Sequence, residues 1–213
     1  MDAFWAYVRE NMLSDVASFA VYTGIAGLFL VCLVKCIAPV LRSRQILKQA
    51  VRHMRRGDES KRKWKDEKFL GTGHLMSHWR EYLNNLLFAD GEFHNPSNVE
   101  DYINADTAIY GPGRAALGEA MPGMMVSLGF LGTLMGISMG LAGFDLSDSQ
   151  AMMDAIRQLV PSMQYAFYTS IAGVVASIGA TVLMRAANGS AHRALLDFYG
   201  ALGRYAEIGR AHV

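Results

Sequence analysis

Cysteine is scarce in this sequence, and both cysteines stand inside an apolar run. The 213 residues contain only Cys32 and Cys36, one helical turn apart. A disulfide between positions i and i+4 of one helix has poor geometry, and a structural zinc site needs about four ligands. We therefore expect neither a disulfide framework nor a metal centre here. Both cysteines are interpreted as residues that face lipid or a neighbouring helix.

Charged side chains are missing from three long stretches. Residues 16–34, 120–144 and 158–184 contain no Asp, Glu, Lys, Arg or His. Each stretch meets the roughly 20 residues needed to cross a hydrocarbon core, where backbone polar groups must be satisfied within the segment. The fold class is therefore predicted to be an all-α membrane protein. Its three transmembrane helices are predicted at residues 16–40, 120–144 and 158–185.

The distribution of lysine and arginine predicts the orientation of these helices. Residues 1–15 carry three acidic residues and one basic residue, the link 145–157 carries three aspartates and one arginine, and the insertion 41–119 begins with a densely basic run. We predict that 1–15 and 145–157 lie outside, and that 41–119 and 186–213 lie in the cytoplasm. The N-terminus lacks the basic start and cleavage site of a signal peptide, so none is expected.

The cytoplasmic insertion is predicted to be helical in three places. Helices are expected over residues 41–67, 74–88 and 99–108, with a turn-rich stretch at 89–98 and a break at Gly111-Pro112-Gly113. The basic run is interpreted as the topology signal on a solvated helix, with attraction to anionic lipid as the alternative. No nucleic-acid recognition module accompanies it, so no nucleic-acid partner is expected.

The sequence also has few features of an enzyme. His74 and His78 stand at metal-binding spacing, but no third ligand is placed to complete a site, so surface histidines are preferred. No nucleophile–base pair or phosphate loop is found, and we expect no enzymatic activity and no bound cofactor.

The C-terminal region has two features of its own. Leu195, Phe198, Tyr199 and Leu202 have helical spacing, which predicts a helix in 186–213 that packs on the insertion. Residues 207–213 read EIGRAHV, which is also a translated sequencing adapter. We therefore expect the natural reading frame to continue beyond them.

The second and third apolar stretches are rich in small residues at helical spacing. Small residues let helix backbones approach closely in lipid. One interpretation is that these stripes only pack the two helices together, or against another copy. The other is that they line a cavity for a helix of a different chain. The residues concerned are Gly129, Gly132, Gly136, Gly140, Gly173, Ser177 and Thr181.

A chain that moves protons through the membrane needs an ionisable group at membrane depth. The two stretches offer hydroxyl groups instead, at Thr133, Thr169 and Ser170. If this chain conducts ions, the titrating carboxylate must come from another chain.

Two segments carry a resemblance to a known family. LGFLGTLMGI, residues 128–137, resembles the second-span signature of the MotA/TolQ/ExbB proton-channel family, and AFYTSIAGVVASIGA, residues 166–180, resembles its last span. The three-span layout is that of TolQ and ExbB. The pattern PGMMVSLGFLGTLMG with AFYTS also resembles the ZorA motor subunits of anti-phage Zorya systems.

The resemblance implies a function. It implies a proton-channel or stator subunit of an ion-driven motor in the bacterial inner membrane. It also implies a homopentamer around a dimer of a MotB/TolR/ExbD-type single-span subunit that carries a membrane aspartate. The transported ion would be a proton, with sodium left open, and the process powered is not indicated. A membrane scaffold, in which the glycine-rich helices serve only oligomerisation, is the alternative.

The resemblance also suggests roles for single residues. Thr133 matches the family threonine of the second span, and Ser170 matches a hydroxyl position of the last span, with Thr169 as its neighbour. Gly129 and Gly173, together with Gly136, would leave room for the partner helix. One departure is Tyr165, which stands where many TolQ and ExbB members have a glutamate.

Overall fold

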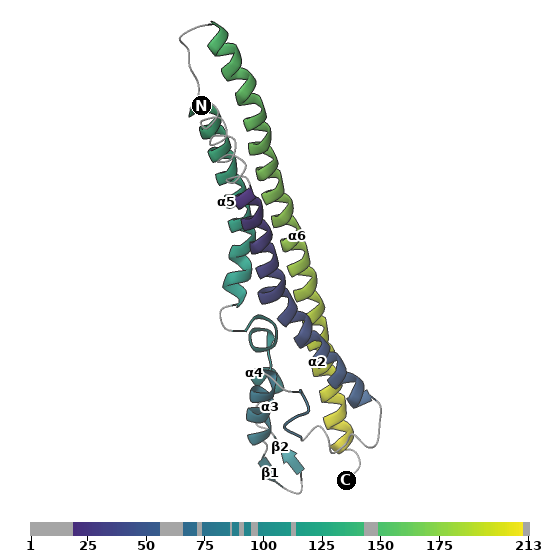
Figure 1. Ribbon diagram of the computed structural model, residues 1–213. Helices are drawn as coiled ribbons and strands as arrows, with labels where there is room; N and C mark the ends of the chain where they lie inside the picture. Colours follow the sequence, from purple (N-terminus) through teal and green to yellow (C-terminus); the bar gives the residue numbers. More distant parts are fainter. Residues whose placement is uncertain are drawn as a thin grey trace. The chain divides into compact units, whose positions relative to one another are not determined.

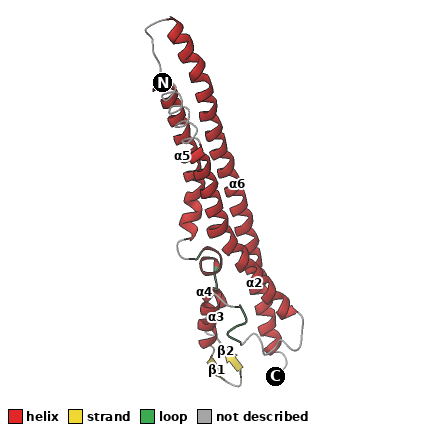
Figure 2. Ribbon diagram, viewed as in Figure 1, coloured by secondary structure: helices red, strands yellow, loops and turns green. Residues whose placement is uncertain are grey.

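The computed structural model describes residues 19–55, 66–71, 74–85, 87–89, 92–94, 98–111, 114–142 and 149–210. Helix dominates these residues, and only two short strands accompany it in the part of the chain so described (Figure 2). The chain divides into two compact units. The membrane unit is Met1–Leu33 with Gly118–Val182, and the loop unit is Val34–Leu117 with Leu183–Val213.

The described residues of the membrane unit belong to parts of three long helices, which can be followed in Figure 1. The first covers residues 19–31 and runs on through a π-helical turn, η1 (Cys32–Ile37), into α2 (Ala38–Arg55). The others are α5 (Arg114–Ala142) and α6 (Ser149–Arg210). All three are long and apolar enough to cross a membrane. The prediction of an all-α membrane protein with three transmembrane helices is confirmed.

These helices leave most of their apolar surface uncovered by the chain itself. Only 28%, 17% and 22% of their most apolar stretches is buried, in chain order. On α5 and α6, Phe130, Val175 and Ile178 are each more than half exposed. Burial of apolar surface is worth about 25 cal/mol per Å², so faces of this kind must meet hydrocarbon or other protein.

The helix α6 is longer than the third span that the sequence predicted. It begins at Ser149, inside the range 145–157 that was predicted as a link, and continues without a break to Arg210. Pro161 lies inside it, and Pro122 lies inside α5. Proline removes one helical hydrogen bond, which membrane helices tolerate where neighbouring groups satisfy the freed carbonyl.

The loop unit contains short elements together with parts of two long helices. They are α2, α3 (His74–Asn84), β1 (Leu87–Ala89), β2 (Glu92–His94), α4 (Val99–Tyr102), a π-helical turn η3 (Asp106–Tyr110) and the end of α6.

Several predicted boundaries in the insertion were wrong. The helix predicted over 74–88 ends at Asn84. The strand β1 lies mostly in the last residues of that predicted helix, and it pairs as an antiparallel hairpin with β2, which lies in the stretch predicted to form turns. The sequence does contain an indication of a hairpin, because Asp90-Gly91 is a dipeptide that is common in hairpin connections. The helix predicted over 41–67 ends at Arg55 within the described residues, and 66–71 form turns.

A core of large side chains holds the loop unit together. Trp79 of α3 is fully buried and stacks on Tyr82, with ring centroids 5.2 Å apart. Its ring also meets Phe198 of α6 edge-on at 6.1 Å. The other large side chains that are fully buried in this unit are Leu47, Leu70, Ile103, Ile109 and Leu195.

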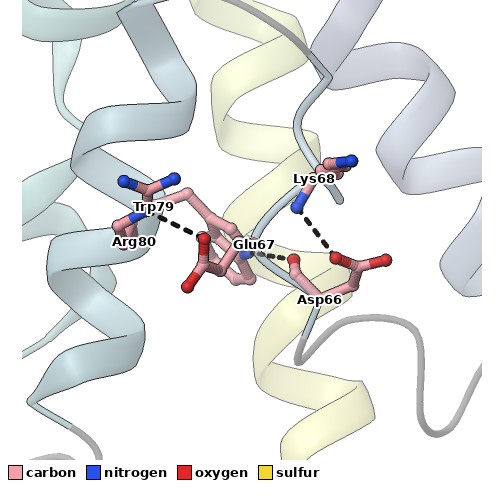
Figure 3. A network of polar contacts seen from close by, with 5 residues as sticks. All are labelled: Asp66, Glu67, Lys68, Trp79 and Arg80. Carbon is pink, nitrogen blue, oxygen red and sulfur yellow. Dashed lines mark hydrogen bonds and ion pairs between the residues drawn. The ribbon is translucent and has the colours of Figure 1, made fainter.

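Polar contacts tie the turn at 66–71 to α3 (Figure 3). The indole N–H of Trp79 donates to the carbonyl oxygen of Asp66 at 3.2 Å. Arg80 pairs with Glu67 at 2.9 Å, and both side chains are about half exposed. The Asp66 carboxylate accepts from the backbone N–H of Lys68 at 3.1 Å, which closes the turn.

The segment from Asn98 to Gly111 is fixed by local hydrogen bonds. The backbone N–H of Asn98 donates to the Asp101 carboxylate at 3.0 Å, a capping contact at the start of α4. Tyr199 of α6 donates its hydroxyl to the carbonyl oxygen of Ile103. Gly111 ends the segment at φ 59°, a backbone conformation that favours glycine.

Candidate functional site

The predicted site residues lie where α5 and α6 pack in the membrane unit. The contacts pair early residues of α5 with late residues of α6, so the two helices are antiparallel. A Cβ placed on Gly173 would lie 2.7 Å from the carbonyl oxygen of Met125 and 3.0 Å from the Cα of Gly129. No side chain larger than hydrogen fits between the two backbones at this point.

The glycine contact continues along α5. A Cβ on Gly132 would lie 2.7 Å from Oγ1 of Thr169, and a Cβ on Gly136 would lie 2.8 Å from the Cβ of Ala166. A Cβ on Gly140 would lie 3.0 Å from Leu159. The space beside these glycines is therefore filled within the chain, as in the packing interpretation of the stripe. Their role toward a partner helix stays a prediction.

The first helix packs against both of the others. A Cβ on Gly132 would also come within 3.0 Å of Val21, and one on Gly24 would lie 2.8 Å from Leu128 of α5. A Cβ on Gly179 of α6 would meet the ring of Phe29 at 3.7 Å. The three helices therefore form one bundle within the membrane unit.

Two of the predicted hydroxyls meet at a single carbonyl oxygen. Thr133 of α5 donates to the carbonyl oxygen of Ala166 on α6 at 3.1 Å, and also to that of Gly129 in its own helix at 3.2 Å. Thr169 donates to the same Ala166 carbonyl at 2.8 Å. An interhelical hydrogen bond of this kind is worth about 0.6 to 2 kcal/mol in a bilayer.

The three hydroxyls differ in how accessible they are. The side chain of Thr169 is only 2% exposed, whereas those of Thr133 and Ser170 are half-buried. Ser170 lies beside the contact, because a Cβ on Gly129 would be 3.3 Å from its Cα. Among the residues that the structure describes, the Ser170 hydroxyl has no hydrogen-bond partner.

Ser177 and Thr181 lie two turns and more along α6 and are separate from this cluster. Thr181 donates its hydroxyl to the carbonyl oxygen of Ser177 at 2.8 Å, a bond within one helix. Both side chains are half-buried. Tyr165, by contrast, is 56% exposed, on the outside of the bundle.

The Ala166 carbonyl is the member of the site that the sequence prediction missed. Threonine commonly bonds a backbone carbonyl three or four residues earlier in its helix, so the spacing of Ala166 and Thr169 was a usable signal. The contribution of Thr133 from α5 depends on the register between two helices, and one sequence does not give that register.

The described residues contain no group of three His, Cys, Asp or Glu that could hold a metal ion. Cys32 and Cys36 are both buried, and neither forms a disulfide.

A family model matches nearly the whole chain. The matching family is the anti-phage protein ZorA of the Zorya type I system, and the match covers residues 9–210. The chain belongs to the ZorA family. ZorA is a branch of the MotA/TolQ/ExbB group, so the resemblance inferred from the two span motifs is confirmed. A comparison with curated proteins found no match.

Family membership and the three apolar helices agree on the broad class of this protein. It is a membrane protein and a member of an anti-phage family. Within the membrane unit, the pairing of α5 with α6 at Ala166 brings hydroxyl groups of both helices to one carbonyl oxygen.

Proposed function

We propose that this chain is the ion-conducting, stator-type subunit of a Zorya type I anti-phage system in the bacterial inner membrane. In this proposal five copies surround a dimer of a single-span partner whose membrane helix carries an aspartate. The N-terminus lies outside and the C-terminus lies in the cytoplasm. Protons are the transported ion, and the chain does mechanical work rather than catalysis.

One observation supports the proposal above all. Thr133 and Thr169 converge on the Ala166 carbonyl, and Ser170 lies next to them, in a bundle whose sequence has no Asp, Glu, Lys, Arg or His at membrane depth. Hydroxyl groups can donate to an ionised carboxylate or accept from a protonated one. A site of this chemistry suits a carboxyl group that is supplied by another chain and changes its protonation state.

The energy available is large enough for the proposed work. Moving one charge across the membrane potential yields about 2.3 kcal/mol per 100 mV. Because the helices present hydroxyls and backbone rather than fixed charges, a partner helix would meet no ion pair that it had to break at each step.

The test starts from co-purification of the chain with the product of the neighbouring gene. We expect a small partner with a single apolar span containing an aspartate. In liposomes that hold the complex, a membrane potential should drive proton flux. The double variant Thr133→Ala with Ser170→Ala should lose most of this flux, by about tenfold or more, while the complex still assembles. Undiminished flux in the double variant would remove the site assignment.

A membrane scaffold is the second candidate, and one observation favours it. Gly129, Gly136 and Gly173 are already in contact across α5 and α6, so the glycine stripe has a packing role without any partner. A scaffold would show no flux under the potential. It would also retain anti-phage protection in the double hydroxyl variant, whereas the proposed motor would lose it.

A further inference from the structure

The hydroxyl groups of Thr133 and Ser170 differ in which further hydrogen bonds they can form. A hydroxyl carries one O–H donor and two acceptor lone pairs. The single proton of Thr133 is committed, because it is shared between the carbonyl oxygens of Gly129 and Ala166 at 3.2 and 3.1 Å. Only acceptor capacity is left on this half-buried oxygen.

The hydroxyl group of Ser170, unlike that of Thr133, still has its proton available for donation. Its hydroxyl makes no hydrogen bond with the residues that the structure describes, and its side chain is half-buried rather than enclosed. It follows Ala166 by four residues, a rise of about 6 Å. A Cβ on Gly129, whose carbonyl oxygen accepts from Thr133, would lie 3.3 Å from the Cα of Ser170, so the two hydroxyl residues are close together. Ser170 can therefore donate a proton to a group that arrives at this surface.

Thr169 is excluded from direct contact with an arriving group. It is 2% exposed, its proton goes to Ala166 at 2.8 Å, and Gly132 covers its oxygen so closely that a Cβ there would lie 2.7 Å away. Thr169 is a positioning residue, since it shares with Thr133 the carbonyl that orients the Thr133 hydroxyl.

We infer that Thr133 and Ser170 bind opposite protonation states of one carboxyl group. This inference rests on the proposed function, in which a partner chain supplies that carboxyl. An ionised carboxylate only accepts hydrogen bonds, so it is bound by the free O–H of Ser170. A protonated carboxyl has an O–H to donate, so it is bound by the lone pairs of Thr133. Gain or loss of the proton then moves the preferred contact from one hydroxyl to the other.

Few other groups of this chain titrate near the two hydroxyls. Residues 16–34, 120–144 and 158–184 contain no acidic or basic side chain. The titratable side chains that the three packed helices do carry at this depth are the phenols of Tyr22, Tyr165 and Tyr168, each at least one-third exposed. The group proposed to gain and lose a proton is the carboxyl of the partner chain, so a pH profile taken in the acid-to-neutral range reports on that carboxyl.

The test is the pH dependence of proton flux through the full chain in complex with its co-purified single-span partner, in liposomes under a fixed potential. Ser170→Ala removes the donor to the ionised form, so the pH of half-maximal flux should rise by about one pH unit. Thr133→Val removes the acceptor for the protonated form, so the same midpoint should fall by a similar amount. Thr133→Ser should return the midpoint toward that of the wild type.

Ser138→Ala is the matched control, because it removes an exposed hydroxyl from α5 away from the cluster and should leave the midpoint unchanged. If Thr133→Val does not assemble, Thr133→Cys replaces it, and its weaker acceptor should still lower the midpoint. Flux with shifts in the same direction, or with no shift, would overturn the inference and leave the proposed function standing. Absence of flux in the wild-type complex would overturn both.

Discussion

The two units of this chain hold their helices together by opposite means. In the membrane unit, α5 and α6 come together at two residues without side chains, Gly129 and Gly173. In the loop unit, α3 and α6 come together at two large rings, those of Trp79 and Phe198. Lipid tails are as apolar as leucine, so helices in a bilayer gain little from large apolar contacts and more from close backbones. In water the burial of large rings is favourable by itself.

This difference teaches how each unit responds to a change of side-chain size. The membrane unit should tolerate loss of apolar side chains and fail when volume is added at a glycine. The loop unit should fail when volume is removed from its core. Four substitutions test this contrast, and the largest effect is expected in the loop unit.

Trp79→Ala should destabilise the loop unit by about 4 kcal/mol. The change removes a fully buried ring, its stacking on Tyr82, and the hydrogen bond from its indole N–H to Asp66. Hydrogen exchange of α3 amides, measured on the full chain in detergent, should speed up by at least a hundredfold. Trp79→Phe is the control, since it keeps an aromatic ring and should cost much less. Equal exchange in Trp79→Ala and wild type would contradict the proposed core.

Gly173→Leu should destabilise the membrane unit by about 3 kcal/mol, because its side chain would collide with the carbonyl of Met125 and with Gly129. The measurement is the thermal unfolding of detergent-solubilised protein, together with its yield from the membrane. Gly123→Leu on α5 is the matched control, because a Cβ there meets nothing within 4 Å. If both variants behaved alike, close packing at Gly129 and Gly173 would not be the source of stability.

Tyr199→Phe should have a smaller effect that depends on pH. Burial, together with the negative charge of Glu100, raises the pKa of Tyr199 to about 12. Because the folded pKa lies above the ordinary value, this contribution to stability is complete below about pH 10 and is lost as pH rises through about 12. The wild-type loop unit should weaken over that window, as followed by tyrosinate absorbance and proteolysis.

The variant should lose about 1 kcal/mol at neutral pH, from the hydrogen bond to Ile103, and should weaken less between pH 10 and 12 than the wild type. An identical alkaline profile in both proteins would show that Tyr199 does not control it.

Arg80→Gln should have the smallest effect. Its ion pair with Glu67 is short, at 2.9 Å, but the two side chains are 49% and 54% exposed. Exposed pairs contribute about 0.5 kcal/mol or less, and added salt screens them. Chemical unfolding at low and high salt should differ slightly for the wild type and not for the variant. A loss comparable to that of Trp79→Ala would mean that charge, rather than ring packing, holds α3.

The sequence predicted the membrane unit better than the loop unit, for a physical reason. Uncharged runs that cross a bilayer have essentially one structural solution, so 120–144 and 158–185 could be read as helices directly. The insertion has no such constraint. In the insertion, local turn residues and tertiary contacts determine where each element begins and ends. For this reason α3 ends at Asn84 and a hairpin forms from β1 and β2.

The candidate site was predicted in its components and not in its geometry. Thr133, Thr169 and Ser170 could be named from composition and family motif. The carbonyl of Ala166 that joins the first two could not, because it depends on how α5 and α6 are aligned. The close packing of the α5 glycines against the chain's own helices depends on the same alignment.

The π-helical turn at Cys32–Ile37 has a consequence for how this chain tolerates changes in length. A π-helical turn contains one residue more than an α-helical turn. It therefore accommodates one inserted residue, which in a regular α-helix would rotate the following residues by about 100° about the helix axis. Removing a single residue between Cys32 and Ile37 would convert this turn to ordinary helix, and α2 after it would keep its own buried face. The same deletion between Val40 and Leu47 would rotate one of these two buried side chains away from the helix face that they share.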